Sequence, residues 1–453
     1  MLSNFNKAAP PAQDQPILLV QNGPIPSFVQ DKPIPLFPAT AATGDTTVNP
    51  GVGYLFCTCL KIGMVSFGGH MALVAMVQKI MADKDKRVSH ETILEGISLA
   101  GLLPGPLAVN VVAHIGYRAK GIAGALASVL GVLLPAFTAM LFLSWLYVDY
   151  GSRQLIPNVW SHITGAVCAI ILSTGVRLFQ KEIKGSNPLN YILCVLTAGV
   201  MLFVTNYYIT LGAILAGVTA GIFLSPAPLH KPEQSPLHNP GQSALQEPGS
   251  PLGWGMLLRL SLLSGLVLQF LADVQRYADS MLLRLAAVFS GISLTLFGGG
   301  YVMIPLMQSM LVDHLHWLTL REFVDGIAFS QATPGPILVS ATFAGYRLAG
   351  AMGAVLATLC IFLPSVLLMI CMSRILLIYK GHTLLKKIMA GVKPIVIGMI
   401  LATGIRLPVQ SGAGVWVWLV ALISFILLCR YRINPVLIIM GTVGIDLLYY
   451  VLK

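Results

Sequence analysis

Residues 98–110 read SLAGLLPGPLAVN, and residues 328–340 read AFSQATPGPILVS. Each segment carries Pro-Gly-Pro, at 104–106 and at 334–336, within an apolar stretch. Proline interrupts a helix because it lacks a backbone N–H and its ring clashes with the preceding turn. Lipid cannot satisfy the backbone groups that such a break frees, so the break must face protein or a water-filled cavity. The two segments therefore predict broken membrane helices whose interruptions point into the protein.

The composition of the chain indicates a polytopic helical membrane protein. Apolar residues make up 56% of the 453 residues and charged residues only 10%, whereas soluble domains average about 25% charged residues. Together with a mean hydropathy of +0.80, this excludes a cytosolic enzyme, a secreted disulfide scaffold and a nucleic-acid-binding domain. The net charge of +11 does not indicate nucleic acid, because basic residues are normal at the loops and helix ends of membrane proteins.

Hydropathy divides the chain into two membrane blocks. A spanning helix needs about 20 mostly apolar residues, and we expect an all-α protein with about 10–13 such helices, some broken at Pro-Gly-Pro. We predict a disordered Pro-rich tail without a signal peptide at 1–50, membrane repeat 1 at 51–224, a Pro-rich linker at 225–251, a linking span or connector at 252–285 and membrane repeat 2 at 286–453. The expected spans lie near 52–81, 91–117, 121–147, 158–178, 188–205, 208–224, 253–273, 286–312, 322–346, 350–378, 386–406, 413–430 and 433–451.

The two blocks repeat each other in sequence. Motifs rich in Gly, Pro and Arg recur in the same order, 229 or 230 residues apart. The matching pairs are Phe-Gly-Gly at 67–69 and 297–299, Pro-Gly-Pro at 104–106 and 334–336, Gly-Tyr-Arg at 116–118 and 345–347, and the segments 174–178 and 403–407. Chance does not keep so many such residues in register over this length. We infer an internal duplication.

Duplicated membrane blocks with interrupted helices are typical of secondary transporters. Their repeats often run in opposite directions, and the substrate binds near the midplane between them. Six spans, one linking span and six more spans would invert the second repeat here. The basic residues of the loops support this arrangement only in part, since Lys84, Lys86 and Arg87 follow the first span.

The two Pro-Gly-Pro breaks are candidate anion-binding ends. Proline suits the first turn of a helix, so Pro106 and Pro336 each predict the start of a half-helix whose N-terminus points inward. A helix N-terminus offers free N–H donors and the positive end of the macrodipole, which favour an anion. Two such ends, one from each repeat, would face one site. A pair of structural kinks is the alternative interpretation.

Candidate substrate-binding residues flank the two breaks. Phe-Gly-Gly lets a ligand or another backbone come close, although small residues also serve close helix packing. The candidates are Phe67, Gly68, Gly69, His70, Pro104, Gly105, Pro106 and Asn110 in repeat 1, and Phe297, Gly298, Gly299, Gly300, Gln331, Pro334, Gly335, Pro336 and Ser340 in repeat 2.

Six charged residues form equivalent pairs and are candidates for gating or anion contact. The pairs are Arg118 with Arg347, Arg177 with Arg406, and Glu95 with Asp325. Arginine suits bidentate recognition of an oxyanion, but these arginines lie near predicted span ends, where long side chains snorkel to the interface. The two carboxylates precede Pro-Gly-Pro by nine residues. They fit proton coupling or pairing with an arginine at a gate, and a solvated charge at a helix end is the alternative.

The sequence carries no motif of an enzyme or a metal site. Walker A, Gly-x-Ser-x-Gly and His-Glu-x-x-His sequences are missing. His70, His90 and His114 do not repeat with Cys or His at metal-binding spacing. We therefore expect no metal, no cofactor and no enzymatic activity.

The duplicated motifs resemble the chromate ion transporter family in its long, two-domain form. Phe-Gly-Gly, an acidic residue followed by Gly, Pro-Gly-Pro and Gly-Tyr-Arg all occur twice in this order, and the resemblance covers about 66–178 and 296–407. It implies two fused, homologous membrane domains of opposite topology with functional residues in Phe-Gly-Gly and Pro-Gly-Pro. Repeat 1 departs from the pattern, because Leu99–Leu103 is apolar where repeat 2 has Gln331. Repeat 1 would then contribute less to the site.

The resemblance also implies a substrate and a location. It implies export of chromate across the plasma membrane by a multi-pass protein, with chromate resistance as the result and sulfate as an isosteric rival. We expect a midplane oxyanion site, alternating access, a proton or a counter-anion as coupling ion, and the lipid bilayer rather than nucleic acid as surroundings. A sulfate or other oxyanion transporter of the same fold and an anion channel are the alternatives. The driving ion and the oligomeric state, a homodimer included, stay open.

Overall fold

The computed structural model describes residues 50–67, 70–101, 103–150, 161–185, 187–204, 207–224, 280–296, 300–376, 383–412 and 414–452. All of them belong to one compact unit. Their regular elements are helices, with no strand among the described residues, so the predicted all-α fold is confirmed. Positions 68, 69 and 297–299 of Phe-Gly-Gly, the linker and the predicted span at 253–273 lie outside the described residues, as does the tail except for its last residue.

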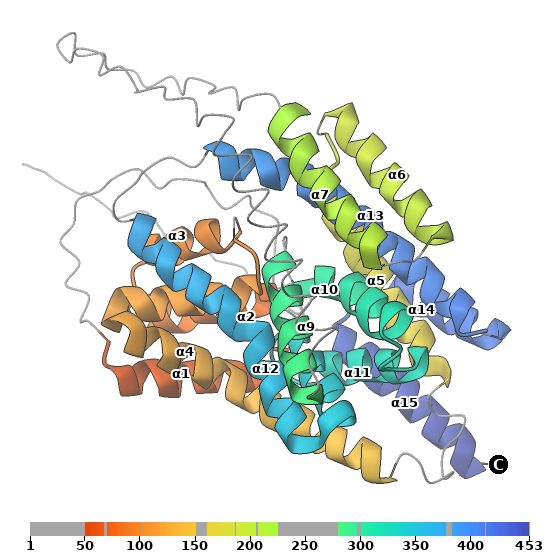
Figure 1. Cartoon of the computed structure of the whole chain (residues 1–453). Helices are drawn as coiled ribbons and strands as arrows, with labels where there is room; N and C mark the ends of the chain where they lie inside the picture. Colours follow the sequence, from red (N-terminus) through yellow and green to blue (C-terminus); the bar gives the residue numbers. More distant parts are fainter. Residues whose placement is uncertain are drawn as a thin grey trace, which may run out of the picture. The chain divides into compact units, whose positions relative to one another are not determined.

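The helices follow the same order in both repeats (Figure 1). Repeat 1 contains α1 (Val52–Val65), α2 (His70–Val77), η1 (Gln78–Lys84), α3 (His90–Ala100), α4 (Leu107–Tyr150), α5 (Ser161–Glu182), α6 (Pro188–Phe203) and α7 (Tyr207–Leu224). Repeat 2 contains α9 (Met281–Thr295), η2 (Gly300–Val302), α10 (Met303–Met307), η3 (Gln308–His314), α11 (Leu320–Ala332), η4 (Ile337–Val339), α12 (Ser340–Leu376), α13 (Thr383–Gln410), α14 (Val415–Arg430) and α15 (Pro435–Leu452).

Four of the described helices are long and apolar enough to cross a membrane. They are Leu107–Asp149, His162–Glu182, Ile337–Arg374 and Lys387–Gln410. Shorter apolar helices of 10–17 residues correspond to most of the other expected spans. The expected span at 52–81 is not one helix, because α1 ends at Val65 and α2 begins at His70.

The helices α3 and α11 lead into the two Pro-Gly-Pro breaks, and both begin with an N-cap. The Ser89 hydroxyl accepts from the Thr92 N–H at 3.2 Å. The equivalent Thr319 forms a full capping box with Glu322. Such caps satisfy backbone donors that a helix start leaves free and fix the residue at which it begins. The caps thus set the position of the break about three turns later.

The long helices α4 and α12 are each a hairpin of two arms. Lys120 and Gly121 have non-helical backbone angles, with φ of −143° and 60°. A Cβ atom on Gly116 would lie 2.3 Å from the carbonyl oxygen of Gly124, although eight residues of straight helix span about 12 Å. The chain therefore folds back at Gly121. The same turn occurs in α12 at Gly350.

Each Pro-Gly-Pro consequently joins two short helical segments. On one side is α3, with 11 residues, and on the other is the first arm of α4, from 107 to the turn at Gly121. At 1.5 Å per residue, 11 residues extend about 16 Å, roughly half of the hydrocarbon thickness. The prediction of helices broken at Pro-Gly-Pro is confirmed, and the break is a tip between half-length helices.

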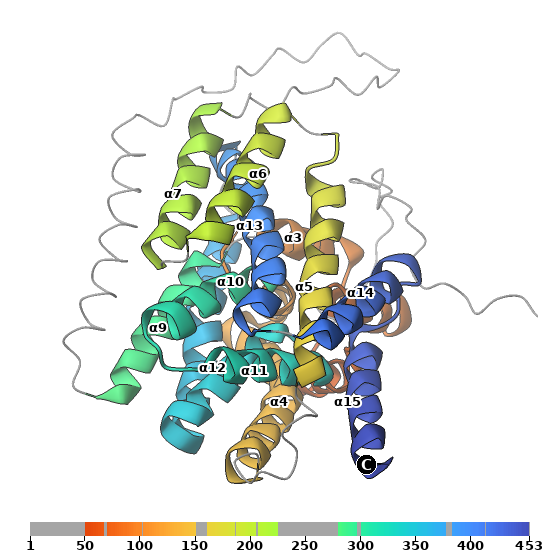
Figure 2. The same cartoon turned by 90° about the vertical axis from the view of Figure 1, so that its right-hand side faces the viewer.

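The equivalent helices α5 and α13 pack against each other in opposite directions (Figure 2). A Cβ atom on Gly175 would lie 2.7 Å from the Leu401 side chain, and one on Gly404 would lie 2.6 Å from that of Leu172. Lys393 Nζ also donates to Glu182 Oε2 at 2.6 Å. Residue numbers thus rise in one helix as they fall in the other. Equivalent helices that pack antiparallel are related by an approximate two-fold axis perpendicular to both.

Candidate functional site

Each Pro-Gly-Pro break binds to the opposite repeat. The Gly105 N–H donates to the carbonyl oxygen of Leu296 at 2.6 Å, and the Gly335 N–H donates to that of Ser66 at 3.0 Å. Leu296 and Ser66 are the residues directly before the two Phe-Gly-Gly motifs. The structure therefore joins each Pro-Gly-Pro to the residue that precedes the other repeat's Phe-Gly-Gly in sequence. Both Pro-Gly-Pro breaks thus lie at the boundary between the repeats.

The central glycines of the breaks are required by backbone geometry and by space. Gly105 has a φ of +115° and Gly335 a φ of +121°, which side-chain-bearing residues rarely adopt. A Cβ atom on Gly105 would lie 2.2 Å from Ser365 Cβ, and one on Gly335 would lie 2.7 Å from Ala136 Cβ. Ser365 and Ala136 occupy equivalent positions, each directly after a proline inside a long helix. The two junctions thus share one construction.

Beside the breaks lie buried polar groups with hydrogen-bonding capacity left over. Asn110 is fully buried; its Nδ2 donates to the Pro104 carbonyl at 3.3 Å, while its Oδ1 lacks a partner among the described residues. Gln331 is 6% exposed, and its Nε2 also has no hydrogen-bond partner among the described residues. Ser340 is buried, with Met307 Sδ 3.9 Å from its hydroxyl. Unsatisfied buried amides cost about 1–3 kcal/mol each, so they are candidates for contact with a ligand.

The Phe-Gly-Gly candidates are only partly described. Phe67 is 41% exposed. His70 begins α2, and Gly300 begins η2 and is buried. Gly68, Gly69, Phe297, Gly298 and Gly299 lie outside the described residues. The described part of the candidate site therefore consists of Pro-Gly-Pro, Asn110, Gln331 and their neighbours.

The carboxylate of Glu95 belongs to a polar group at the side of α3. His114 Nε2 lies 3.8 Å from Glu95 Oε2, and Arg118 Nη2 lies 3.9 Å from it. His114 Nδ1 is 2.8 Å from the hydroxyl oxygen of Ser373, which belongs to repeat 2. Glu95 thus lies within ion-pair distance of Arg118, and its neighbour His114 connects the two repeats.

The equivalent carboxylate, Asp325, has a different environment. It is 1% exposed, and its Oδ2 accepts a hydrogen bond from the Tyr147 hydroxyl at 2.8 Å. Tyr147 comes from α4 of repeat 1 and packs edge-on against Phe329 and Phe343. Asp325 is therefore a buried group held by the opposite repeat. A solvated charge at a helix end does not describe it.

The arginine equivalent to Arg118 does not reach Asp325. Arg347 Nε donates to Glu322 Oε1 at 2.6 Å, and the Arg347 side chain is 46% exposed. Glu322 is the residue that completes the capping box of α11. The ion pair thus lies at the exposed start of α11, about a turn from the buried carboxylate.

Arg177 and Arg406 bind the C-terminal carbonyls of helices in the opposite repeat. Arg177 Nη2 donates to the Leu428 oxygen at 2.6 Å, and Arg406 Nη1 donates to the Met201 oxygen at 3.4 Å. Each carbonyl lies two residues before the helix end, in α14 and α6 respectively. Cations stabilise a helix C-terminus because its carbonyls are unpaired and its dipole is negative there. The structure places this pair at helix ends.

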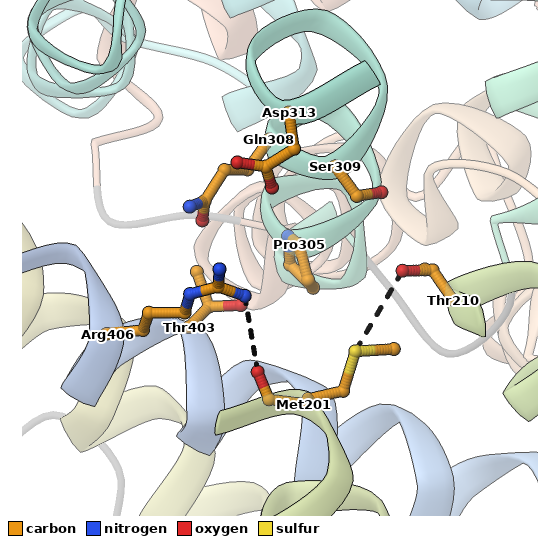
Figure 3. A pocket seen from close by; sticks show the side chains of 8 residues that line it. All are labelled: Met201, Thr210, Pro305, Gln308, Ser309, Asp313, Thr403 and Arg406. Atoms are coloured by element: carbon orange, nitrogen blue, oxygen red, sulfur yellow. Dashed lines mark hydrogen bonds between the residues drawn. The ribbon is translucent and has the colours of Figure 1, made fainter. Parts of the chain in front are cut away.

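One of these arginines also lines a cavity that contains several polar side chains (Figure 3). The cavity has an empty volume of about 270 Å³ including its open mouth. Its lining comes from α6, α7, α10, η3 and α13, namely Met201, Thr210, Pro305, Gln308, Ser309, Asp313, Thr403 and Arg406. Sequence reasoning named only Arg406 among these as a candidate. The signal for two others was present, because Gln308 and Asp313 recur from Gln78 and Asp83.

The described part of the chain contains no group of three or more His, Cys, Asp or Glu side chains that could hold a metal ion. What the arrangement offers is backbone donors, amides, two arginines at helix ends and several carboxylates. This is the chemistry of ion recognition and proton binding.

Comparison with known proteins gives a consistent result. A family model described as chromate transporter matches residues 53–222 and again 283–447, which supports the internal duplication. A chromate transport protein of Cupriavidus metallidurans is 26% identical over 420 residues, covering 91% of this chain and 97% of that protein. A chromate transport protein of Pseudomonas aeruginosa is 27% identical over 373 residues, covering 82% and 84%. An uncharacterized transporter of Methanocaldococcus jannaschii is 26% identical over 392 residues, covering 86% and 93%. No solved structure matches the chain.

Proposed function

The chain belongs to the chromate transporter family, and we propose that it is a secondary transporter that exports chromate across the plasma membrane and so confers chromate resistance. Membership in the family supports chromate transport by a multi-pass membrane protein that is not an enzyme. The observation that carries the more specific proposal is the reciprocal binding of each Pro-Gly-Pro to the other repeat. This contact would let both repeats contribute to one site.

The proposed oxyanion site lies between the two Pro-Gly-Pro breaks. A divalent anion that leaves water must receive hydrogen bonds in exchange for its hydration shell. The N-termini after Pro106 and Pro336 would supply backbone N–H groups, and the unpartnered Nε2 of Gln331 would supply a side-chain donor. Asn110 would turn its amide to present nitrogen to the same ligand. The Phe-Gly-Gly segments would close the site from the opposite repeat.

We further propose inverted repeats, 51–224 and 286–453, that work by alternating access. The antiparallel packing of α5 and α13 supports inversion, because a two-fold axis along the membrane normal would make equivalent helices parallel. With the axis in the membrane plane, the site near it would lie close to the midplane. Rocking of one repeat against the other would then open the site to each side in turn.

Uptake of labelled chromate into everted membrane vesicles that contain the protein tests this proposal. We expect saturable, energy-dependent uptake that excess sulfate weakens, because the two anions share charge and geometry. Sulfate uptake without chromate uptake would assign the same fold to a sulfate transporter. Chromate accumulation that never exceeds electrochemical equilibrium would indicate an anion channel. Either result would overturn the export of chromate.

A matched pair of variants locates the site. Gln331→Ala removes a buried amide whose Nε2 has no hydrogen-bond partner among the described residues. We expect a KM for chromate at least several-fold higher, because a hydrogen bond to a charged group contributes about 1.5–3 kcal/mol. Gln180→Ala serves as the control, because Gln180 is exposed on α5 and does not line the cavity beside Arg406. An unchanged KM in Gln331→Ala would place the substrate elsewhere.

A further inference from the structure

The cavity beside Arg406 contains a carboxylate, that of Asp313, which makes no hydrogen bond or ion pair within the described part of the chain. Asp313 is half-buried, and its Oδ2 is shielded from solvent and makes no hydrogen bond with the described residues. Among the ion pairs of the described residues none joins Asp313 to Arg406. Both nevertheless line the same cavity, from η3 and from α13 (Figure 3). A shielded carboxylate that faces a cation without contacting it is costly unless it is protonated.

The guanidinium of Arg406 has its donors directed elsewhere. Nη1 donates to the Met201 carbonyl at the long distance of 3.4 Å. Gln410, with its amide oxygen turned toward the guanidinium, accepts from Nη2 and Nε at 2.9 and 3.0 Å. Arg406 therefore holds the end of α6 and its own helix, rather than the carboxylate opposite. This is the arrangement expected when Asp313 is neutral.

The remaining lining of the cavity is rich in acceptors. Ser309 donates its hydroxyl proton to the Leu306 carbonyl at 3.1 Å, and Thr403 donates to the Met399 carbonyl at 2.9 Å. Their oxygen lone pairs are left for the cavity. An oxyanion needs donors, so it fits this lining poorly, and a metal cation would be repelled by Arg406. Water and a proton fit acceptors beside a carboxylate.

Resting on the proposed function, we propose that Asp313 binds the coupling proton of chromate transport, and that its protonation decides which partner Arg406 takes. Protonation forms an O–H bond at Asp313 Oδ2 with a proton from water on one side of the membrane. Arg406 then caps α6. Release of the proton leaves a carboxylate that attracts the guanidinium and competes with the weak contact to Met201. The two protonation states thus differ in the partner that Arg406 holds beside the end of α6.

Few other charged groups face Asp313. From α13 there is Arg406, and from the turn after η3 there is His316. His314, on η3 itself, stacks on Tyr207 and meets Tyr208 edge-on, both from α7. The cavity lining from α6 and α7, Met201 and Thr210, carries no charge. Among the described residues that line the cavity, Arg406 is therefore the only permanently charged partner of Asp313.

The duplication supplies a control at the equivalent position of repeat 1. Asp83 has a side chain that is 54% exposed and pairs with His90 at 3.2 Å. Its equivalent arginine, Arg177, contacts Leu428 at the end of α14. Asp83 is thus solvated, and of the two carboxylates Asp313 alone has the shielded position that coupling requires.

Purified protein in liposomes separates coupling from substrate binding. Exchange of labelled for unlabelled chromate at equal pH on both sides requires binding and movement, but no net proton transfer. Accumulation driven by a pH gradient, with the membrane potential clamped, requires coupling as well. For one proton per anion, one pH unit supports up to about tenfold accumulation, since 1.4 kcal/mol is a factor of ten. We expect both activities in the wild type and in Asp83→Asn.

Asp313→Asn should keep exchange within about twofold and lose accumulation, because the amide mimics the protonated acid and cannot cycle. Accumulation that persists in Asp313→Asn, or exchange that disappears with it from a well-folded protein, would overturn the proposal. If Asp313→Asn does not fold, Asp313→Glu decides, with accumulation retained and its pH midpoint displaced as the required result. A wild type without chromate exchange would refute the proposed function, whereas one that exchanges chromate but ignores the pH gradient would refute only this inference.

Discussion

Gly105 shows how a single residue position serves both the backbone and the contact between repeats. Its φ of +115° places it where a side chain is strained. The Cβ atom of any other residue would also lie 2.2 Å from Ser365 Cβ, well inside van der Waals contact. Gly121 separates these two effects, because its φ is +60° but nothing lies within 4 Å of its would-be Cβ atom.

We therefore expect Gly105→Ala to be more harmful than Gly121→Ala. Both variants carry backbone strain of about 1–3 kcal/mol, and only the first must also separate the repeats. Melting temperatures of the purified proteins, with chromate exchange, measure the difference. Equal losses in the two variants would mean that the Ser365 contact yields without cost.

Tyr147 makes a hydrogen bond between the repeats that depends on its hydroxyl group. Its hydroxyl is the donor to Asp325 Oδ2. Tyr147→Phe would leave a buried acceptor unpaired, which costs about 1–3 kcal/mol, or more for a charged group. We expect a lower melting temperature, and we expect Tyr147→Phe with Asp325→Asn to recover part of it.

A double-mutant cycle over these two positions measures their coupling. Additive losses would contradict the hydrogen bond as a stabilising contact. The pair lies 178 residues apart, and periodicity or motif spacing cannot reveal such a partner. Sequence reasoning therefore identified Asp325 as a matched carboxylate and had no means to find Tyr147.

At the scale of elements, the breaks were predictable and their geometry was not. Pro-Gly-Pro within an apolar run predicts an interruption because proline chemistry is local. The expected span at 52–81 hid the interruption between α1 and α2, because hydropathy averages over a window and does not register where a helix stops. Hydropathy likewise predicted only a boundary between two spans near Gly121, and not that the chain folds back there. The contact of Gly116 with Gly124 that shows the fold-back is tertiary and is not visible in the sequence.

The arginines at helix ends give a prediction at this scale. If Arg177 stabilises the C-terminus of α14 through the Leu428 carbonyl, Arg177→Gln should lower stability by about 0.5–2 kcal/mol and leave the KM for chromate nearly unchanged. Arg177→Lys should lose less, because it retains the charge. Thermal unfolding and transport kinetics of both variants test this. A raised KM at unchanged stability would instead assign Arg177 to the anion.

For the whole molecule, the antiparallel packing of α5 and α13 has a consequence for topology. Glu91 and Arg321 are equivalent residues, 230 apart, and both are exposed at the starts of α3 and α11. In inverted repeats they lie on opposite sides of the membrane, whereas in parallel repeats they share a side. Loop charges could not decide between these arrangements, because Lys84, Lys86 and Arg87 oppose the pattern of the other basic residues.

Labelling of cysteines introduced singly at these two positions therefore reports the topology directly. Cys57, Cys371 and Cys429 are exposed, so the seven native cysteines are first replaced by serine or alanine. In intact cells, a membrane-impermeant maleimide should label one of Glu91→Cys and Arg321→Cys, and in everted vesicles it should label the other. Labelling of both from the same side would rule out an axis in the membrane plane. The equivalent, antiparallel helices α5 and α13 could then not both span the bilayer. The symmetry between the repeats would have to be derived from the Pro-Gly-Pro junctions alone.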